Sequence, residues 1–244
     1  MQLTRSTFTS LTIRIFAISA TCLCLNACET LSEFDDLLNP AQSTELGTST
    51  IAAGLREALT VGAGRVVNSL GAENGFLDSK FHIPLPDKLK KAQEVAGRFG
   101  MSGIFDDLEV QLNRAAEAAT PKARDLFVDA IKAMTFMDVM NIYQGADDAA
   151  TQYLQRTTAE QLNLQMRPVV DQGLNQVGAV STFKDLATQY NRLPLVKPVD
   201  ADISGHVLKY ASTALFAELA KEEAAIRNEP VKRTTELLRR VFRS

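Results

Sequence analysis

Apolar side chains recur about once per helical turn through most of the chain from residue 48 onward. In the first such segment, residues 48–71, they fall on one face at a period near 3.6, and Gly71 follows as a stop. This row comprises Ile51, Leu55, Leu59, Gly62, Val66 and Leu70. No stretch alternates apolar and polar residues for long enough to predict a strand. The pattern therefore predicts an all-α fold, a single bundle-like domain of about eight to ten helices.

The later helices have recognisable ends at glycine, at proline or at a capping residue. We expect helices over residues 87–99, 103–119, 121–134, 135–144, 148–179, 182–192, 203–227 and 230–242. Residues 72–86 form a loop, because Asn74-Gly75 is a turn signal and a proline follows both Ile83 and Leu85. Pro168 should kink or divide the longest of these helices.

Several helical positions carry a specific expectation. Ile104 shares the apolar side of its helix with Leu108. Thr120, which precedes a proline, is expected to cap the next helix. Thr135 with Asp138 resembles a capping box in which Asp replaces Glu.

Three small residues recur at every fourth position of the first helix. Gly54, Ala58 and Gly62 leave little side chain on that stripe, so another backbone can come close to it. We interpret the stripe as a packing surface.

The first 27 residues differ from the rest of the chain. They carry Arg5 and Arg14 and no acid, and an apolar run of 11 residues follows at 15–25. Such a run is too short to cross a bilayer, which needs roughly 20 residues. A basic start, a short apolar stretch and a small residue before the cut are typical of a secretory signal.

Leu25-Asn26-Ala27-Cys28 resembles the bacterial lipobox, in which cleavage precedes a cysteine that becomes lipidated. We therefore expect residues 1–27 to be removed, 28–47 to form a lipidated tether and 48–244 to form the domain. Glu29 stands where an aspartate often marks inner-membrane retention in such proteins, which favours the periplasmic face of the outer membrane. The alternative is an ordinary signal peptide followed by a chance cysteine.

Removal of this segment changes the chemistry of the chain. Cys22 and Cys24 are lost with it, so no cysteine is left for a disulfide and the domain must be held by packing. The formal charge of −3 becomes −5, with 24 basic residues against 29 acidic ones. A mildly acidic body lacks the basic face of a nucleic-acid-binding protein, so no nucleic-acid partner is expected.

The stretch GADDAATQYLQRTTAEQL, residues 145–162, gathers polar side chains after a glycine. Asp147 is expected to accept the free N–H groups of the next helix, and Asp148 to complement its positive end. As metal ligands or an acid/base pair they would need further partners, and none is close in sequence. Thr151 and Arg156 lie near one helical side, where a polar stripe is either solvated or lines a cleft.

Two other motifs, NRAAEAATP (113–121) and AKEEAAIRNEP (220–230), place charges beside alanines. Glu223 precedes Arg227 at the favourable spacing of four. The charges form either surface ion pairs, each worth about 0.3–0.5 kcal/mol, or a polar cleft in which buried charges need partners. The candidate cleft residues are Asn113, Arg114, Glu117, Asp147, Asp148, Thr151, Arg156, Glu222, Glu223 and Arg227.

No catalytic, metal or cofactor motif is recognisable. His82 and His206 are the only histidines and lie far apart in sequence. DADISG, residues 200–205, opens like a calcium loop, but its twelfth position is Ala211 rather than glutamate, so Asp202 is expected to cap a helix. We assign no catalytic residue, no metal and no cofactor.

The last helix separates apolar from basic residues. Val231, Leu238, Val241 and Phe242 are expected to face the core, with Lys232, Arg233, Arg239, Arg240 and Arg243 facing away. The basic side is either solvated or touches an anionic lipid surface.

Seven motifs together resemble one family: GLREAL (54–59), LG…NGF (70–76), IPLP (83–86), NRAAEAA (113–119), FVDAI (127–131), GADDAATQY (145–153) and EEAAIRNEP (222–230). The chain looks like a member of an uncharacterised bacterial family labelled domain of unknown function, number four-one-nine-seven, over roughly residues 46–243. It departs from that pattern at Leu112 and Leu154. The resemblance implies an exported, all-helical protein and no known activity. It strengthens the expectation that the polar motif residues gather in one cluster.

Three hypotheses follow. In the first, the chain is a non-catalytic module, lipid-anchored to the membrane through Cys28, that binds an envelope protein or a small ligand. In the second, it is an enzyme that acts through carboxylates and arginines on an envelope component. In the third, it is purely structural. Convergence of five polar residues in one pocket would favour the enzyme. They are Asn113, Glu117, Asp147, Arg156 and Glu223.

Overall fold

The computed structural model describes residues 47–100, 102–199 and 202–242. The chain divides into two compact units, Met1–Gly47 and Thr48–Ser244. The predicted signal segment and Cys28 lie outside the described residues, as does Arg243.

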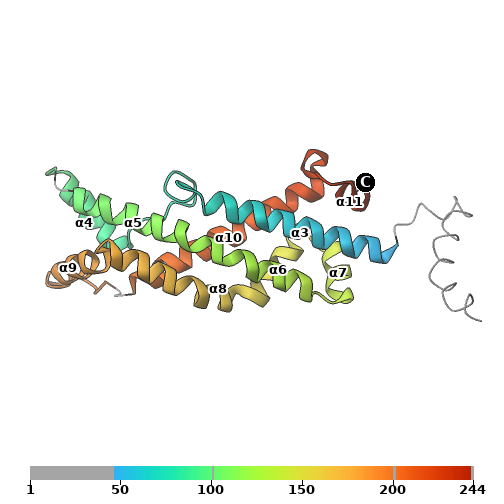
Figure 1. Cartoon of the computed structure of the whole chain (residues 1–244). Helices are drawn as coiled ribbons and strands as arrows, with labels where there is room; N and C mark the ends of the chain where they lie inside the picture. The colour runs from blue at the N-terminus through green and yellow to red at the C-terminus, as the bar shows by residue number, and fades with distance from the viewer. Residues whose placement is uncertain (1–46, 101, 200–201, 243–244) are drawn as a thin grey trace, which may run out of the picture. The chain divides into compact units, whose positions relative to one another are not determined.

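In the described part of the second unit every regular element is helical, as predicted (Figure 1). The α-helices are α3 (Thr48–Leu70), α4 (Asp87–Gly97), α5 (Gly103–Ala119), α6 (Ala123–Ala133), α7 (Phe136–Tyr143), α8 (Ala149–Gln176), α9 (Ala179–Asn191), α10 (Ile203–Asn228) and α11 (Glu236–Val241). Two 3-10 turns, η1 (Thr120–Lys122) and η2 (Pro230–Lys232), precede α6 and α11. Among the helices of residues 47–100, 102–199 and 202–242, none combines the length and the apolar character that spanning a membrane requires.

Four helices run side by side and enclose the core. α8 packs against α10 and α5, and α10 also packs against α3. Contacts show that α8 and α10 are antiparallel, because the start of α8 meets Glu223 late in α10 and Arg167 late in α8 meets Asp202 before α10. All six residues of the predicted row on α3 are buried, so the helical period located the core correctly.

The shorter helices cover the two ends of this unit. Figure 1 shows α4 and α9 at one end, with α7 and α11 at the other. The small-residue stripe of α3 is a packing surface as predicted, since a Cβ at Gly54 would lie 2.5 Å from Val241 Cγ2 of α11. At Gly62 the near neighbour is Ile226 of α10, 3.4 Å from the same hypothetical atom.

The predicted cap at Thr120 was wrong. Its hydroxyl donates to the Ala116 carbonyl at 2.8 Å, and α6 begins at Ala123 after η1. Pro168 lies inside α8 and does not divide it, so of the two predicted outcomes only a kink is left. Buried side chains on either side of the proline, Met166 and Val170, hold the helix to the core, and such packing outweighs a missing backbone bond. The capping box of Thr135 and Asp138 is confirmed.

Three burial predictions were also wrong. Ile104 is exposed, because the buried side of α5 runs through Phe105 and Leu108 instead. The C-terminal helix starts at Glu236 rather than Pro230, with the Thr235 hydroxyl accepting from the Leu238 N–H. Residues 230–232 form the 3-10 turn η2, which has a different period from an α-helix. As a result Val231 is exposed and Arg233, directly after the turn, is buried.

Candidate functional site

The start of α8 is capped by a side chain from another helix. Glu223 of α10 accepts hydrogen bonds from the Ala150 N–H at 3.0 Å and from the Thr151 N–H at 2.8 Å. The Thr151 hydroxyl donates to the same carboxylate at 2.9 Å. These N–H groups occupy the second and third positions of the helix, which an N-cap side chain ordinarily satisfies. A negative charge also suits the positive end of a helix.

Arg227, one turn further along α10, does the reverse for α7. Its guanidinium donates to the Ile142 carbonyl at 2.8 Å and to the Tyr143 carbonyl at 3.4 Å, at the C-terminal end of that helix. It also pairs with Glu223 at 2.9 Å, and the side chains are only 10% and 6% exposed. The Glu223–Arg227 pair therefore satisfies the end of α7 and the start of α8 at once, with the charge that each helix end favours.

Asp147 does not cap α8, contrary to expectation. Its carboxylate accepts from the Asn228 side chain at 3.0 Å, and Asp148 occupies the N-cap position without a side-chain bond to the backbone. Asp148 accepts from the Gln152 side chain instead. The GADD turn is thus held to the end of α10 through Asp147, whereas Asp148 bonds within its own helix.

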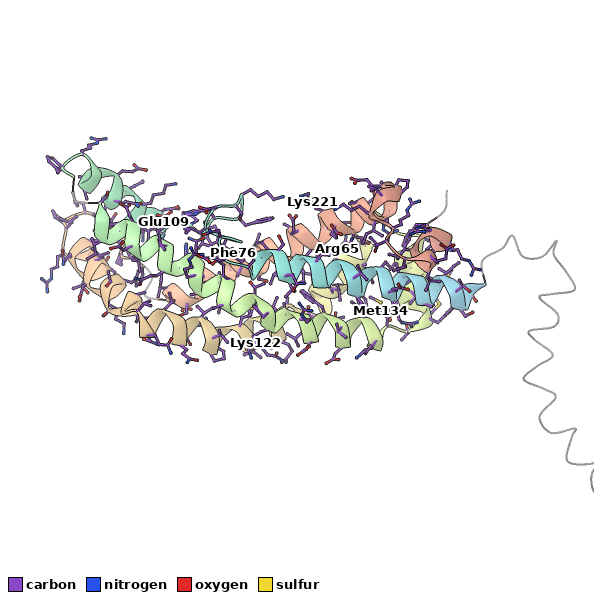
Figure 2. The ribbon with its side chains drawn as sticks, turned by 45° about the horizontal axis from the view of Figure 1, so that its top comes forward. Arg65, Phe76, Glu109, Lys122, Met134 and Lys221 are labelled. Atoms are coloured by element: carbon purple, nitrogen blue, oxygen red, sulfur yellow. The ribbon has the colours of Figure 1, made fainter. Side chains whose placement is uncertain are left out.

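The loop between α3 and α4 is held by a second group of polar side chains on α5. Asn113, fully buried, accepts from the Ile83 N–H at 2.8 Å and donates to the Ile83 carbonyl at 2.9 Å. Glu117 accepts from the N–H groups of Phe76 and Leu77, at 3.1 and 3.3 Å. Figure 2 labels Phe76 in this loop and Glu109 on α5.

Arg114 supports the same group from the solvent side. It pairs with Glu117 at 2.7 Å and donates to the Asn74 side chain at 2.8 Å. Apart from a bond from Asn113 to the Glu109 carbonyl within α5, the hydrogen bonds of Asn113, Arg114 and Glu117 tie α5 to the 71–86 loop or join these residues to one another. The NRAAEAA motif is therefore the part of α5 that fixes the shape of this loop.

Both histidines also hold this loop in place, His82 from within the loop and His206 from α10. His82 Nδ1 lies 2.8 Å from the Leu77 carbonyl oxygen, and Nε2 contacts the Glu109 carboxylate. His206 Nε2 lies 2.8 Å from the Pro84 carbonyl oxygen. Glu109 was not singled out from the sequence, although its spacing of four from Asn113 on a helix placed it on the same face.

Both nitrogens of His82 face acceptors, and only the protonated ring can donate to both. Burial alone would lower the pKa of His82, but the bonds to Glu109 and to the Leu77 carbonyl outweigh it, so its pKa lies above the ordinary value. Burial lowers the pKa of His206. As the pH falls, protonation of His82 therefore favours the folded state, whereas protonation of His206 disfavours it.

We expect His82→Gln to cost more stability in acid than in base. The raised pKa means that the contribution of His82 is fully present below about pH 6.5 and is lost as the pH rises through the pKa of the folded state. The cost should be about 0.5–1 kcal/mol at pH 5.5, a small value because a third of the side chain is exposed. Urea unfolding of both proteins at pH 5.5 and pH 8.5 measures it, and an equal cost at both pH values would contradict it.

The remaining candidate residues lie at the surface or in other ion pairs. Arg156 is exposed on α8. Glu222 pairs with Arg65 of α3 at 2.7 Å and with Lys232 at 3.4 Å. Apart from Arg156 and Glu222, the candidate residues thus fall into a group around the Glu223–Arg227 pair and a group along α5. In both groups the buried side chains bond to backbone of other elements.

The cavity beside the buried Glu223 carboxylate is small. Thr151 and Glu223 border a cavity of about 20 Å³ whose other walls are apolar side chains of α3, α8 and α10. That volume holds about one water molecule, so a substrate has no room there.

Asp202 caps α10 through the Gly205 N–H as predicted and pairs with Arg167 at 3.1 Å. In the described residues no three His, Cys, Asp or Glu side chains gather closely enough to hold a metal ion.

Together, these contacts define an all-helical protein in which buried polar side chains satisfy helix ends and hold one long loop. The chain belongs to the family described as Protein of unknown function (DUF4197), whose family model matches residues 45–243. The resemblance seen in the seven motifs is thereby confirmed. Neither the curated proteins nor the solved structures yielded a match.

Proposed function

We propose that this protein is exported and anchored through lipid on Cys28 at the periplasmic face of the bacterial outer membrane, where its helical unit is a non-catalytic module that binds another envelope component. The anchor is supported by the basic start, the short apolar run and the LNAC sequence at residues 25–28. Three acyl chains, as on lipoproteins that this chain resembles, would hold it stably.

One observation carries the binding role: the buried carboxylates of the motifs are already used by the fold. Glu117 and Glu223 are 5% and 7% exposed, and each accepts from two backbone N–H groups. A general acid or base must come within hydrogen-bond reach of its substrate. The alternative, an enzyme acting through these carboxylates on an envelope component, would have to break the bonds that hold α8 and the 71–86 loop. Binding through the outer surface requires no such change.

The test is to isolate the tagged full-length protein from the envelope after chemical cross-linking in intact cells. Mass spectrometry is expected to find an acylated Cys28 as the first residue and one protein or lipid component in stoichiometric amount. The matched control is Cys28→Ser, which cannot carry a thioether-linked lipid and should therefore yield no acylated N-terminal peptide. Repeated recovery of background alone would reject the binding role, and a mature first residue other than an acylated Cys28 would reject the anchor.

A further inference from the structure

The connection between α4 and α5 stands clear of the rest of the helical unit. A Cβ atom built at Gly100 or Gly103 would meet no atom within 4 Å, and at Gly97 it would meet only Ser102. Gly100 has a φ of +71°, which allows the sharp reversal between the helices. α4 itself is peripheral, with Leu89 as its only buried residue.

This tip carries apolar side chains that the fold does not use. Phe99 is 72% exposed, Val95 is 55% exposed one turn before it, and Ile104 is exposed at the start of α5. We call these three residues, with Arg98, the α4–α5 tip. Exposed apolar side chains scattered singly need no explanation, but a group at a protruding turn indicates an interaction site.

The exposed charges of α4 and the residue after it are three cations and two acids. Lys90, Lys91 and Arg98 stand against Asp87 and Glu94, whereas Lys88 donates to the Pro198 carbonyl. Asp106 of α5 accepts from Gln93 and Ser102 and is turned toward α4. Asp107 is exposed on the first turn of α5. The cation closest in sequence to Phe99 is its neighbour Arg98.

We propose that the α4–α5 tip inserts into the interface of a phospholipid bilayer, with Arg98, Lys90 and Lys91 against anionic headgroups. The tip is convex, and a bilayer accepts a convex apolar group without the matching hollow that a protein partner must supply. Apolar and aromatic side chains flanked by cations bind the headgroup boundary in this way. This inference rests on the proposed function, since it names the partner of the binding module.

The experiment uses the chain from residue 28 onward with Cys28→Ser, so that no acyl chain contributes to binding. Its co-flotation is compared between vesicles of phosphatidylethanolamine with phosphatidylglycerol and vesicles of phosphatidylcholine. The protein is expected to bind the first and to bind the second less. Phe99→Ser should lower binding about tenfold or more, because it removes the largest apolar side chain of the tip. Arg98→Gln should lower binding to the anionic vesicles about fivefold.

Phe136→Ser is the matched control, because Phe136 is 51% exposed on α7 at the other end of the unit. It should bind as the unsubstituted protein does, and circular dichroism should show that all the variants keep their helical content. Failure of the unsubstituted protein to bind vesicles, or equal binding by Phe99→Ser, would overturn the inference. So would a photocross-linker at position 99 that captures a protein in cells while vesicles are not bound. The stoichiometric envelope component sought above could still be found in that case, so the two proposals fail separately.

Discussion

Glu223→Ala is expected to lower the free energy of unfolding by about 3–5 kcal/mol. The substitution leaves the Arg227 guanidinium without its carboxylate at a site where the arginine side chain is only 10% exposed. It also removes the acceptor of the Ala150 and Thr151 N–H groups at the start of α8. Urea unfolding followed by circular dichroism measures the loss.

Glu160→Ala is the control for this prediction, because Glu160 is an exposed glutamate on α8. It should change stability by no more than about 0.5 kcal/mol. The double variant Glu223→Ala/Arg227→Ala should lose less than the sum of the single variants, since the two side chains share one set of contacts. A loss below about 1 kcal/mol for Glu223→Ala would show that the cap contributes little.

Asn113→Ala is expected to lower the free energy of unfolding by about 3 kcal/mol. It leaves the N–H and the carbonyl of Ile83 without the partners that the fully buried Asn113 side chain supplies. Urea unfolding measures the total cost. Hydrogen exchange at the Ile83 amide reports the same contact locally. The substitution should accelerate exchange at this amide more than exchange at amides in the middle of α8.

Asn163→Ala tests whether the effect belongs to the buried site, because Asn163 is exposed on α8. Its stability should stay within about 0.5 kcal/mol of the unsubstituted protein. If Asn113→Ala kept the stability and left the Ile83 amide equally protected, the 71–86 loop would be held by its apolar contacts alone.

Local chemistry made several elements predictable. The apolar period located the buried face of α3, where all six predicted residues are buried, and residues at the same period in α10, Ile203, Val207 and Ala211, are buried as well. Thr135 and Asp138 form their capping box because both partners lie within one helical turn. Asp202 caps α10 for the same reason, because its carboxylate accepts from the Gly205 N–H three residues later.

The candidate site depended on contacts that sequence spacing does not encode. Asp147 was the plausible cap for α8 by position. The Thr151 N–H instead donates to Glu223, which lies 72 residues after Thr151 along the chain. The spacing of Glu223 and Arg227 correctly predicted their ion pair, yet not that both are buried. Ile104 fitted the helical period and is exposed, because no element covers the start of α5 on that side.

The amino-acid sequence by itself determined that this chain is helical, where its main helices lie and to which family it belongs, because helix period, turn residues and motifs are properties of short segments. Only the tertiary structure decided what the polar motif residues do. The backbone groups that they satisfy belong to helix ends and a loop from other parts of the chain, and these meet only when the helices have packed.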